Sequence, residues 1–395
     1  MRLRHPDGSL LHISYGTNVH PAQDVDGLVE QVRRFAGPVR RRIGADRLGL
    51  GLWLPAEATR HLAADPSAVD LLRKALDHEG LEVVTVNAFP YGNFHAPVVK
   101  KAVYRPDWTQ DERLGYTLDC ARVLTRLLPD DVARGSISTL PLGWRDPWDD
   151  VRAAAARERV DRLAEGLADL EERTGRTVRV AFEPEPGCVA ETAAGVAEHL
   201  RGIDTDRLGA CLDLCHLATE FEEPAAALAA LDEAGLPVVK TQVSAALHCE
   251  DPRDPAALAA LEEFAEARFL HQVRERRAGA ETTVDRRDDL PDALGRVYGT
   301  AGLPGDGPWR VHVHVPLHAT PRPPLRSTRD VLTGALDLLV GGAHPVVDHL
   351  ETETYTWSVL PDHLRPHDDD GLVAGIAAEL DWTRSQLVDR GMEVL

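Results

Sequence analysis

Short apolar runs alternate with longer amphipathic stretches along the whole chain. The apolar runs have the length expected of buried β-strands, and polar or Gly/Pro-containing segments separate them. Nine such runs can be recognised, at residues 11–19, 48–55, 81–90, 136–143, 178–187, 209–218, 237–246, 310–317 and 346–355.

The stretches between these runs have the spacing of amphipathic helices. Segment 24–37 begins with a candidate acidic N-cap, and Gly37 is its expected stop. Segment 151–176 is rich in Ala and Leu, with apolar residues at helical spacing. Segment 368–391 is the last helix-like stretch. Strand and helix therefore alternate from one end of the chain to the other.

This alternation predicts a parallel sheet covered by helices, in one domain that spans residues 1–395. A closed (β/α)8 TIM barrel fits better than an open sheet, because no GxGxxG motif follows the first strand. A barrel also builds its active site at the carboxyl ends of its strands. Polar residues occur at or near many of these ends: Asn18, Asn87, Glu183, Asp213, Gln242, His314 and Glu351.

Nine runs are one too many for an eight-stranded barrel. Segment 248–309 is the expected site of an elaboration, because it interrupts the regular alternation. The run 310–317, RVHVHVPL, is then expected either to extend or to replace a neighbouring strand. Its alternating His312 and His314 could serve a metal, or could simply pair with acids.

Composition narrows the function classes. The net charge of −20 argues against nucleic acid or an anionic membrane as the main partner. No apolar run is long enough to predict a membrane span, and the first residues lack the apolar centre of a signal peptide. Five cysteines without a CxxC pair indicate reduced thiols and a cytoplasmic protein. A small metabolite is the expected partner, and a homo-oligomer is left open.

Acidic residues within apolar runs are the strongest chemical signal. Asp213 is the lone acid inside CLDLCHLA, and charged side chains are almost never buried unpaired. Several carboxylates at one barrel mouth would repel one another unless a divalent cation lay between them. Carboxylate oxygens with an imidazole nitrogen or an amide oxygen suit Mn²⁺, Mg²⁺, Co²⁺ or Zn²⁺, and the sequence does not choose among these metals.

Side-chain alternation groups further candidates, because residues two apart on a strand share a direction. The groups are Glu183 with Glu185, Lys240 with Gln242, His312 with His314, and Glu351 with Glu353. His216 lies three residues after Asp213, just past the end of the same strand-like run.

The order of these motifs resembles the xylose isomerase-like barrel superfamily of sugar isomerases, epimerases and endonuclease IV relatives. The motifs are a Glu in AFEP, then LDxxH, then a polar strand, then LExE. The resemblance implies a metal held by Glu183, Asp213 and Glu351, with His216 contacting the substrate. The seventh-strand ligand departs from the family pattern, and either Gln242 or His314 would take its place. Glu353 occupies a second position on the last strand.

Three longer phrases, NAFPYGNFH, HVHVPLH and HLETETYTWSVLP, resemble the EboE-type branch of metabolite traffic proteins. In the first phrase, Asn87 and His95 are candidate substrate contacts in a loop at the barrel mouth.

The favoured hypothesis is a metal-dependent isomerase or epimerase acting on a sugar-like or polyhydroxylated metabolite. Glu183 and Glu351 would move the proton from opposite sides. The substrate would be held by Asn87, His95, Glu185, His216, Lys240, His312 and Glu353. Two alternatives stay open: a Schiff-base aldolase that uses Lys240, and a non-catalytic EboE-type protein that binds and transfers a metabolite.

Overall fold

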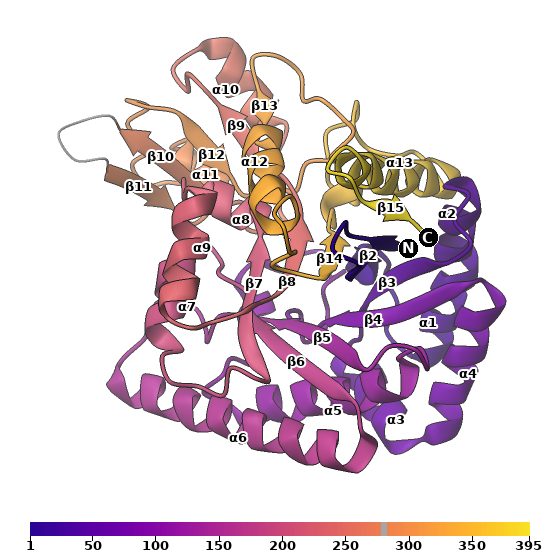
Figure 1. Ribbon diagram of the computed structural model, residues 1–395. Helices are drawn as coiled ribbons and strands as arrows, with labels where there is room; N and C mark the ends of the chain where they lie inside the picture. The colour runs from indigo at the N-terminus through magenta and orange to yellow at the C-terminus, as the bar shows by residue number, and fades with distance from the viewer. Residues whose placement is uncertain (278–282) are drawn as a thin grey trace.

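The computed structural model describes residues 1–277 and 283–395. Its centre is a barrel of eight parallel strands, closed because the last strand pairs with the first (Figure 1). The barrel strands in order are β2 (Leu10–Gly16), β3 (Leu48–Trp53), β4 (Leu81–Asn87), β5 (Arg134–Thr139), β6 (Thr177–Phe182), β7 (Leu208–Asp213), β8 (Val238–Val243) and β14 (His349–Thr352). The predicted (β/α)8 barrel is confirmed.

Helices cover the outside of the barrel, so several strands have no exposed residue at all, as in other parallel sheets with two covered faces. The α-helices are α1 (Val25–Gln31), α2 (Gly37–Arg42), α3 (Ala56–Ala64), α4 (Pro66–His78), α5 (Asp111–Leu127), α6 (Asp150–Thr174), α7 (Ala193–His199), α8 (Leu214–Thr219), α9 (Pro224–Glu233), α10 (Pro255–Glu262), α11 (Leu290–Ala293), α12 (Arg329–Val340) and α13 (Asp369–Val388). Shorter helical turns are η1 (Thr17–Val19), η2 (Val32–Ala36), η3 (Lys100–Tyr104) and η4 (Thr356–Ser358).

The helical segments predicted from periodicity are present, with one boundary corrected. Asp24 caps α1 by accepting a hydrogen bond from the Gly27 amide, as its position suggested. Gly37, however, does not stop the helix. It keeps helical dihedrals, and η2 and α2 carry the helical path on to Arg42. A glycine is needed there for space, because a β-carbon would overlap the Glu79 carboxylate.

A second sheet is inserted between β8 and β14. It is antiparallel, in the order β11 (Thr283–Arg287), β10 (Val273–Arg277), β12 (Trp309–Val311), β9 (Leu247–Cys249) and β13 (Arg326–Ser327). Figure 1 shows this sheet beside the barrel, together with α10 and α11. The elaboration expected at 248–309 is therefore real, but it ends later than predicted, because β13 completes the sheet beyond the histidine run.

The ninth strand-like run neither extends nor replaces a barrel strand. Only Trp309–Val311 is a strand, and it pairs with β10 and β9 of the second sheet. After Val311 the chain leaves the sheet as an irregular segment that carries His312 and His314. The second sheet thus brings both histidines to the barrel, which their sequence positions did not reveal.

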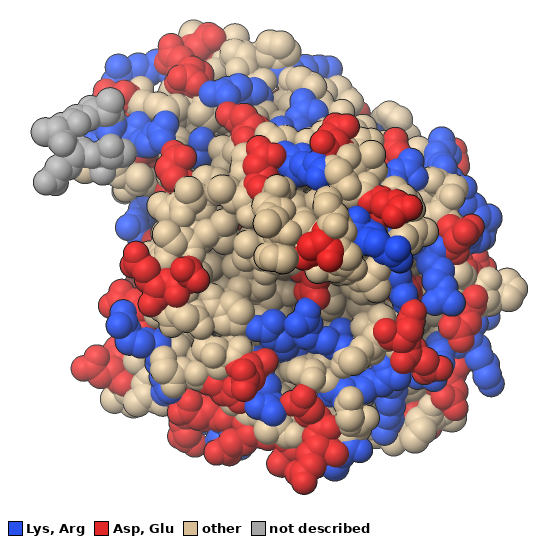
Figure 2. Space-filling model, viewed as in Figure 1, with Lys and Arg blue, Asp and Glu red and all other residues tan. Residues whose placement is uncertain are grey.

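The two ends of the chain lie side by side, because β1 (Arg2–Arg4) pairs with both β2 and β15 (Glu393–Val394) (Figure 1). On the face shown in Figure 2, acidic and basic side chains are interspersed. Within residues 1–277 and 283–395, no helix combines the length and hydropathy that a membrane crossing requires. All five cysteines are unpaired and buried, as the sequence predicted.

Barrel closure leaves no room for a side chain at Gly51 on β3. A β-carbon there would overlap the carboxylate of Glu351, which comes from β14. We expect Gly51→Ala to lower the free energy of unfolding by about 1–3 kcal/mol, the usual cost of overpacking. Urea unfolding measures this loss.

Gly115→Ala is the matched control. Gly115 lies exposed on α5, and a β-carbon there would meet nothing within 4 Å. This change should raise stability by about 0.5–1 kcal/mol, because alanine favours the helix. Equal stability of the two variants would contradict the packing proposed around Glu351.

Candidate metal centre

Three carboxylates converge where β6, β7 and β14 end. Glu183 follows β6 directly, Asp213 is the last residue of β7, and Glu353 follows β14 directly. One oxygen from each lies within 4.8 Å of an oxygen of the other two. Asp213 also belongs to a second group, in which the side chains of His216 and His314 meet it within the same distance.

Asp213 has one oxygen engaged and one free. Its Oδ1 atom caps α8, accepting hydrogen bonds from the amides of Cys215 and His216 and from the Ser244 hydroxyl at 2.7–2.9 Å. Its Oδ2 atom is buried and has no hydrogen-bond partner among the described residues. That oxygen lies 3.8 Å from Nε2 of His314. The helix cap therefore fixes the carboxylate and leaves one oxygen directed into the site.

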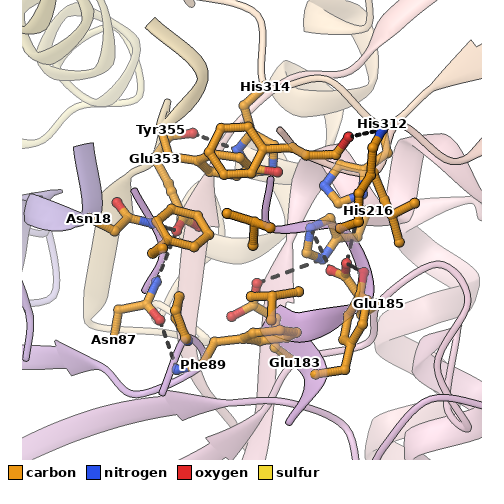
Figure 3. A pocket seen from close by; sticks show the side chains of 18 residues that line it. Asn18, Asn87, Phe89, Glu183, Glu185, His216, His312, His314, Glu353 and Tyr355 are labelled. Carbon is orange, nitrogen blue, oxygen red and sulfur yellow. Dashed lines mark hydrogen bonds and ion pairs between the residues drawn. The ribbon is translucent and has the colours of Figure 1, made fainter. Parts of the chain in front are cut away.

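Glu353 is held in a similar way by two amides. Its Oε1 atom accepts hydrogen bonds from the side chains of Asn18 at 2.7 Å and Asn87 at 2.9 Å. Asn87 is oriented in turn by the Phe89 amide, which donates to its Oδ1 atom. Figure 3 shows these two asparagines beside Glu353, with Glu183 across the pocket. The sequence placed Asn18 at a strand end but gave it no site role.

The three histidines share one orientation. Nδ1 of His216 contacts the Pro184 carbonyl at 2.9 Å, and Nδ1 of His314 contacts the Glu353 carbonyl at 2.7 Å. A carbonyl only accepts, so Nδ1 carries the proton in both rings. Nδ1 of His312 meets Oε1 of Gln272 at 2.8 Å. In His312 and His314 this leaves Nε2 without a partner among the described residues, the usual arrangement of metal-binding histidines. Nε2 of His216 lies instead beside Glu185.

The buried acids raise one another's pKa values. Burial and the nearby Asp213 carboxylate raise the pKa of Glu353 to about 8. Burial and the nearby Glu353 carboxylate raise the pKa of Glu183 well above its usual range. Burial and the neighbouring imidazoles lower the pKa of His312. The carboxylates of the cluster therefore lack enough positive charge nearby to balance them, and a bound cation would supply it.

His216 is the exception among the imidazoles. Its Nε2 atom lies 3.0 Å from Glu185 Oε2, and the other Glu185 oxygen accepts a hydrogen bond from the Tyr104 hydroxyl. Burial by itself lowers the pKa of His216, but the Asp213 and Glu185 carboxylates outweigh it and raise this pKa well above the usual value. His216 and Glu185 thus form a buried ion pair beside the carboxylate cluster.

The atoms that lack partners fit a divalent cation. Four buried ligand atoms of the residues that line this site lack a hydrogen-bond partner among the described residues: Glu183 Oε2, Asp213 Oδ2, His312 Nε2 and His314 Nε2. A buried polar atom without a partner is costly, so a native protein rarely leaves several together. Oxygen and imidazole ligands in this number suit Mn²⁺, Mg²⁺, Co²⁺ or Zn²⁺.

Two predicted site residues lie elsewhere. Glu351 and Lys240 form an ion pair at 3.2 Å inside the barrel, and both side chains are fully buried. Burial lowers the pKa of Lys240, but Glu351 together with Cys211, Glu353 and Glu183 outweighs this effect and raises it. Neither residue lines the pocket, and Glu351 belongs to none of the converging ligand groups found among the described residues.

Gln242 and His95 also differ from expectation. Gln242 pairs in register with both Asp213 and Glu351, and neither polar atom of its buried amide has a partner among the described residues. It does not line the pocket. His95 donates a hydrogen bond from Nε2 to the Asn18 carbonyl at 2.8 Å and packs against Trp53. It therefore supports the loop that carries Asn18 and does not reach the pocket.

A pocket lies above the cluster. Its polar side includes eight residues that Figure 3 labels: Asn18, Asn87, Glu183, Glu185, His216, His312, His314 and Glu353. Its outer part is lined by Tyr104, Phe94, Phe269 and Tyr355, none of which the sequence singled out. Phe94 and Tyr355 did fall within quoted motifs, but neither was given a role there. Because these aromatic residues are far apart in the sequence, no local sequence pattern shows that they line the same side of the pocket.

The fold and the cluster agree with a family-level match. A family model described as a xylose isomerase-like TIM barrel matches residues 41–270, which is more than half of the chain. The chain belongs to the xylose isomerase-like TIM barrel family. The matched segment contains Glu183 and Asp213 but ends before His312, His314 and Glu353. No curated protein matches the chain, and nothing in the comparisons bears on the EboE-type branch.

Several solved structures are similar to the chain. D-allulose 3-epimerase from Methylomonas sp. is 14% identical, with a TM-score of 0.49 over 95% of this chain and 98% of that one. A xylose isomerase-like TIM barrel protein from Mycobacterium smegmatis, in complex with magnesium, is 12% identical, with a TM-score of 0.47 over 94% and 98%. D-psicose 3-epimerase from Clostridium cellulolyticum, with D-tagatose, is 14% identical, with a TM-score of 0.47 over 95% and 99%. Similarity at this level says nothing about the activity of this chain.

The Lys240–Glu351 pair gives a stability prediction. Lys240→Met or Glu351→Met alone leaves a buried charge without its partner and should cost about 3–5 kcal/mol. The double variant removes both charges and should be more stable than either single variant. Urea unfolding of all four proteins gives the coupling free energy.

Arg122→Ala is the control, because Arg122 forms an exposed pair with Asp119 on α5 and such pairs contribute little. Its unfolding midpoint should stay close to that of the wild type. Additive losses in the double variant of the buried pair would show that Lys240 and Glu351 do not depend on each other.

Proposed function

We propose that this protein is a divalent-metal-dependent enzyme of isomerase or epimerase type, acting on a small metabolite with a carbonyl beside a hydroxyl. The observation that supports it is the convergence of the side chains of Glu183, Asp213, His314 and Glu353. The first three each have one buried ligand atom without a hydrogen-bond partner among the described residues. These four residues would hold the metal. When bound, the metal would polarise the substrate carbonyl and stabilise negative charge on its oxygen.

Glu183 and Glu353 are the proposed acid–base pair. They come from β6 and β14, which lie on either side of β7 and Asp213 in the sheet. One glutamate would remove a proton from the carbon next to the carbonyl, and the other would return a proton from the opposite side. Burial and the neighbouring carboxylates raise both pKa values in the metal-free protein, and a bound cation would lower them again.

This assignment gives Glu353, and not Glu351, the metal-ligand and acid–base roles expected of the last strand. The two residues share one direction along the last strand, but Glu351 lies one step deeper and is neutralised by Lys240. His314 is the preferred seventh-strand ligand, since its Nε2 atom approaches Asp213. Gln242 stays in the proposal as a further candidate ligand, because its buried amide lacks partners among the described residues.

The remaining polar residues would orient the substrate. His216 and Glu185 form an ion pair and line the pocket. They can therefore form hydrogen bonds with substrate hydroxyl groups while each charge keeps its partner. His312 offers a free Nε2 atom beside them. Asn87 fixes Glu353, and the amide dipole thereby holds the carboxylate in one position.

The alternatives are weaker on this geometry. A Schiff-base aldolase needs a neutral amine that faces the substrate, whereas Lys240 is buried, charged by its pairing with Glu351 and outside the pocket. A carrier of the EboE type would bind metal and ligand without proton exchange, which the second experiment below detects. The five buried, unpaired cysteines are in keeping with the proposed cytoplasmic location.

Metal content is the first test. Asp213→Asn and Glu353→Gln should each lower the affinity for Mn²⁺ by about 10-fold or more, because each removes a negative ligand. Titration of the metal-stripped protein, followed by mass spectrometric metal analysis, measures this effect. The matched control is Glu275→Gln, a buried carboxylate that accepts hydrogen bonds from Gly305, Asp306 and Trp309 in the second sheet.

Glu275→Gln should keep the metal affinity of the wild type. If the wild-type protein binds no divalent metal more tightly than the Asp213 and Glu353 variants do, the metal-dependent function is wrong.

Proton exchange is the second test. The metal-loaded protein in D₂O should catalyse deuterium incorporation at the carbon beside the carbonyl of an α-hydroxyketone, as NMR would show. Glu183→Gln and Glu353→Gln should each slow this exchange by about 10²–10⁴-fold, the usual contribution of a general acid or base. Glu275→Gln, outside the pocket, is the control and should keep the exchange rate of the wild type. Ligand binding with no exchange at any carbon would favour the carrier.

A further inference from the structure

The outer half of the pocket has a different chemistry from its floor. Nine of its lining residues are apolar or aromatic: Phe89, Pro90, Phe94, Val99, Val103, Tyr104, Phe269, Leu270 and Tyr355. They come from the segment between β4 and α5, from the insertion before β10 and from the segment after β14. A site built for a free sugar would need polar groups along this wall to receive its hydroxyls.

Three aromatic rings of this wall contact one another. The ring centroids of Phe94 and Phe269 are 5.1 Å apart, those of Phe94 and Tyr355 are 5.3 Å apart, and those of Phe269 and Tyr355 are 5.0 Å apart. The Tyr355 ring also packs at 4.7 Å against the ring of His314. The aromatic wall therefore begins directly beside the proposed metal ligands.

Several polar groups near this wall are already engaged. The amide nitrogens of Asn18 and Asn87 both donate to Glu353. The Tyr104 hydroxyl donates to Glu185 and accepts from Gln272. These hydrogen bonds leave the outer pocket few donors for a substrate hydroxyl.

The cation at the rim is engaged as well. The Lys100 ammonium donates to the carbonyl oxygens of Glu266 and Phe269 and to the Asp289 carboxylate, which uses all three of its protons. No arginine is among the described residues that line the pocket. A phosphate group would therefore meet no free cation here, although phosphate recognition usually needs one.

We infer that the substrate is amphiphilic: a carbonyl–hydroxyl end that reaches the carboxylate cluster, joined to an unphosphorylated aryl or alkyl group that lies against Phe94, Phe269 and Tyr355. This inference rests on the proposed function for the oxygen-bearing end and on the wall for the other end. Covering the aromatic rings removes apolar surface from water, which favours binding. A substrate that is hydroxylated along its whole length would lose hydration there without replacement.

The test compares two probes that differ only in the group carried by the ketone. Isothermal titration of the Mn²⁺-loaded protein measures the affinity for 2-hydroxyacetophenone, which carries a phenyl group, and for hydroxyacetone, which carries a methyl group. We expect the phenyl compound to bind at least about tenfold more tightly. D-fructose and D-fructose 6-phosphate, the fully polar probes, should bind more weakly than the phenyl compound.

Variants locate the preference. Phe269→Ala should reduce the phenyl-to-methyl affinity ratio by at least about threefold. Phe94→Leu is a milder change and should also reduce the ratio. It provides the test if Phe269→Ala fails to fold. Phe221→Ala is the matched control, because Phe221 is also buried but does not line the pocket. It should leave the ratio unchanged.

The inference is overturned if the phenyl probe fails to bind, if both ketones bind equally, or if a fully polar sugar or sugar phosphate binds more tightly. It is also overturned if Phe269→Ala and Phe94→Leu leave the ratio unchanged. Failure of the proposed function has a different signature, namely no metal-dependent deuterium exchange in any bound ketone. A phenyl preference without exchange would uphold the apolar wall and reject the isomerase.

Discussion

Electrostatic repulsion among buried carboxylates is the constraint on which this site depends. Glu183, Asp213 and Glu353 bring ligand oxygens within 4.8 Å of one another in a place that water scarcely reaches. Burial, and then the repulsion between such close carboxylates, raises the pKa values of Glu183 and Glu353. A metal would relieve the repulsion and keep the carboxylates ionised.

Contacts from the rest of the molecule hold the three carboxylates and the histidines together despite this repulsion. A helix cap fixes Asp213, two asparagine amides fix Glu353, and backbone carbonyls set the tautomers of His216 and His314. Each support comes from a different strand end or loop, so closure of the barrel is what assembles them. The inserted sheet adds Gln272, which orients His312 through a side-chain hydrogen bond. Supporting contacts of this kind hold functional groups in one geometry before the substrate arrives.

Beneath the cluster, the barrel contains a second compensated charge. Lys240 neutralises Glu351 where the fold leaves no water, and Gly51 makes room for that carboxylate. Above the cluster, aromatic rings from three distant segments form an apolar wall. The site is therefore layered along the barrel axis, with a neutralised ion pair at the bottom, a charge-deficient cluster in the middle and an apolar rim. Only the middle layer calls for a ligand cation.

The sequence by itself determined the barrel, because strand and helix periodicities are local properties that survive folding. It also indicated Glu183, Asp213 and the two histidines, since polar residues at strand ends must face a shared rim. Only the tertiary structure could separate Glu353 from Glu351, because both point the same way and depth in the barrel depends on strand stagger. Likewise, the second sheet that delivers His312 and His314, and the ring contacts of Phe94, Phe269 and Tyr355, join segments far apart in the chain. Contacts between such segments depend on how the barrel closes, which no local pattern records.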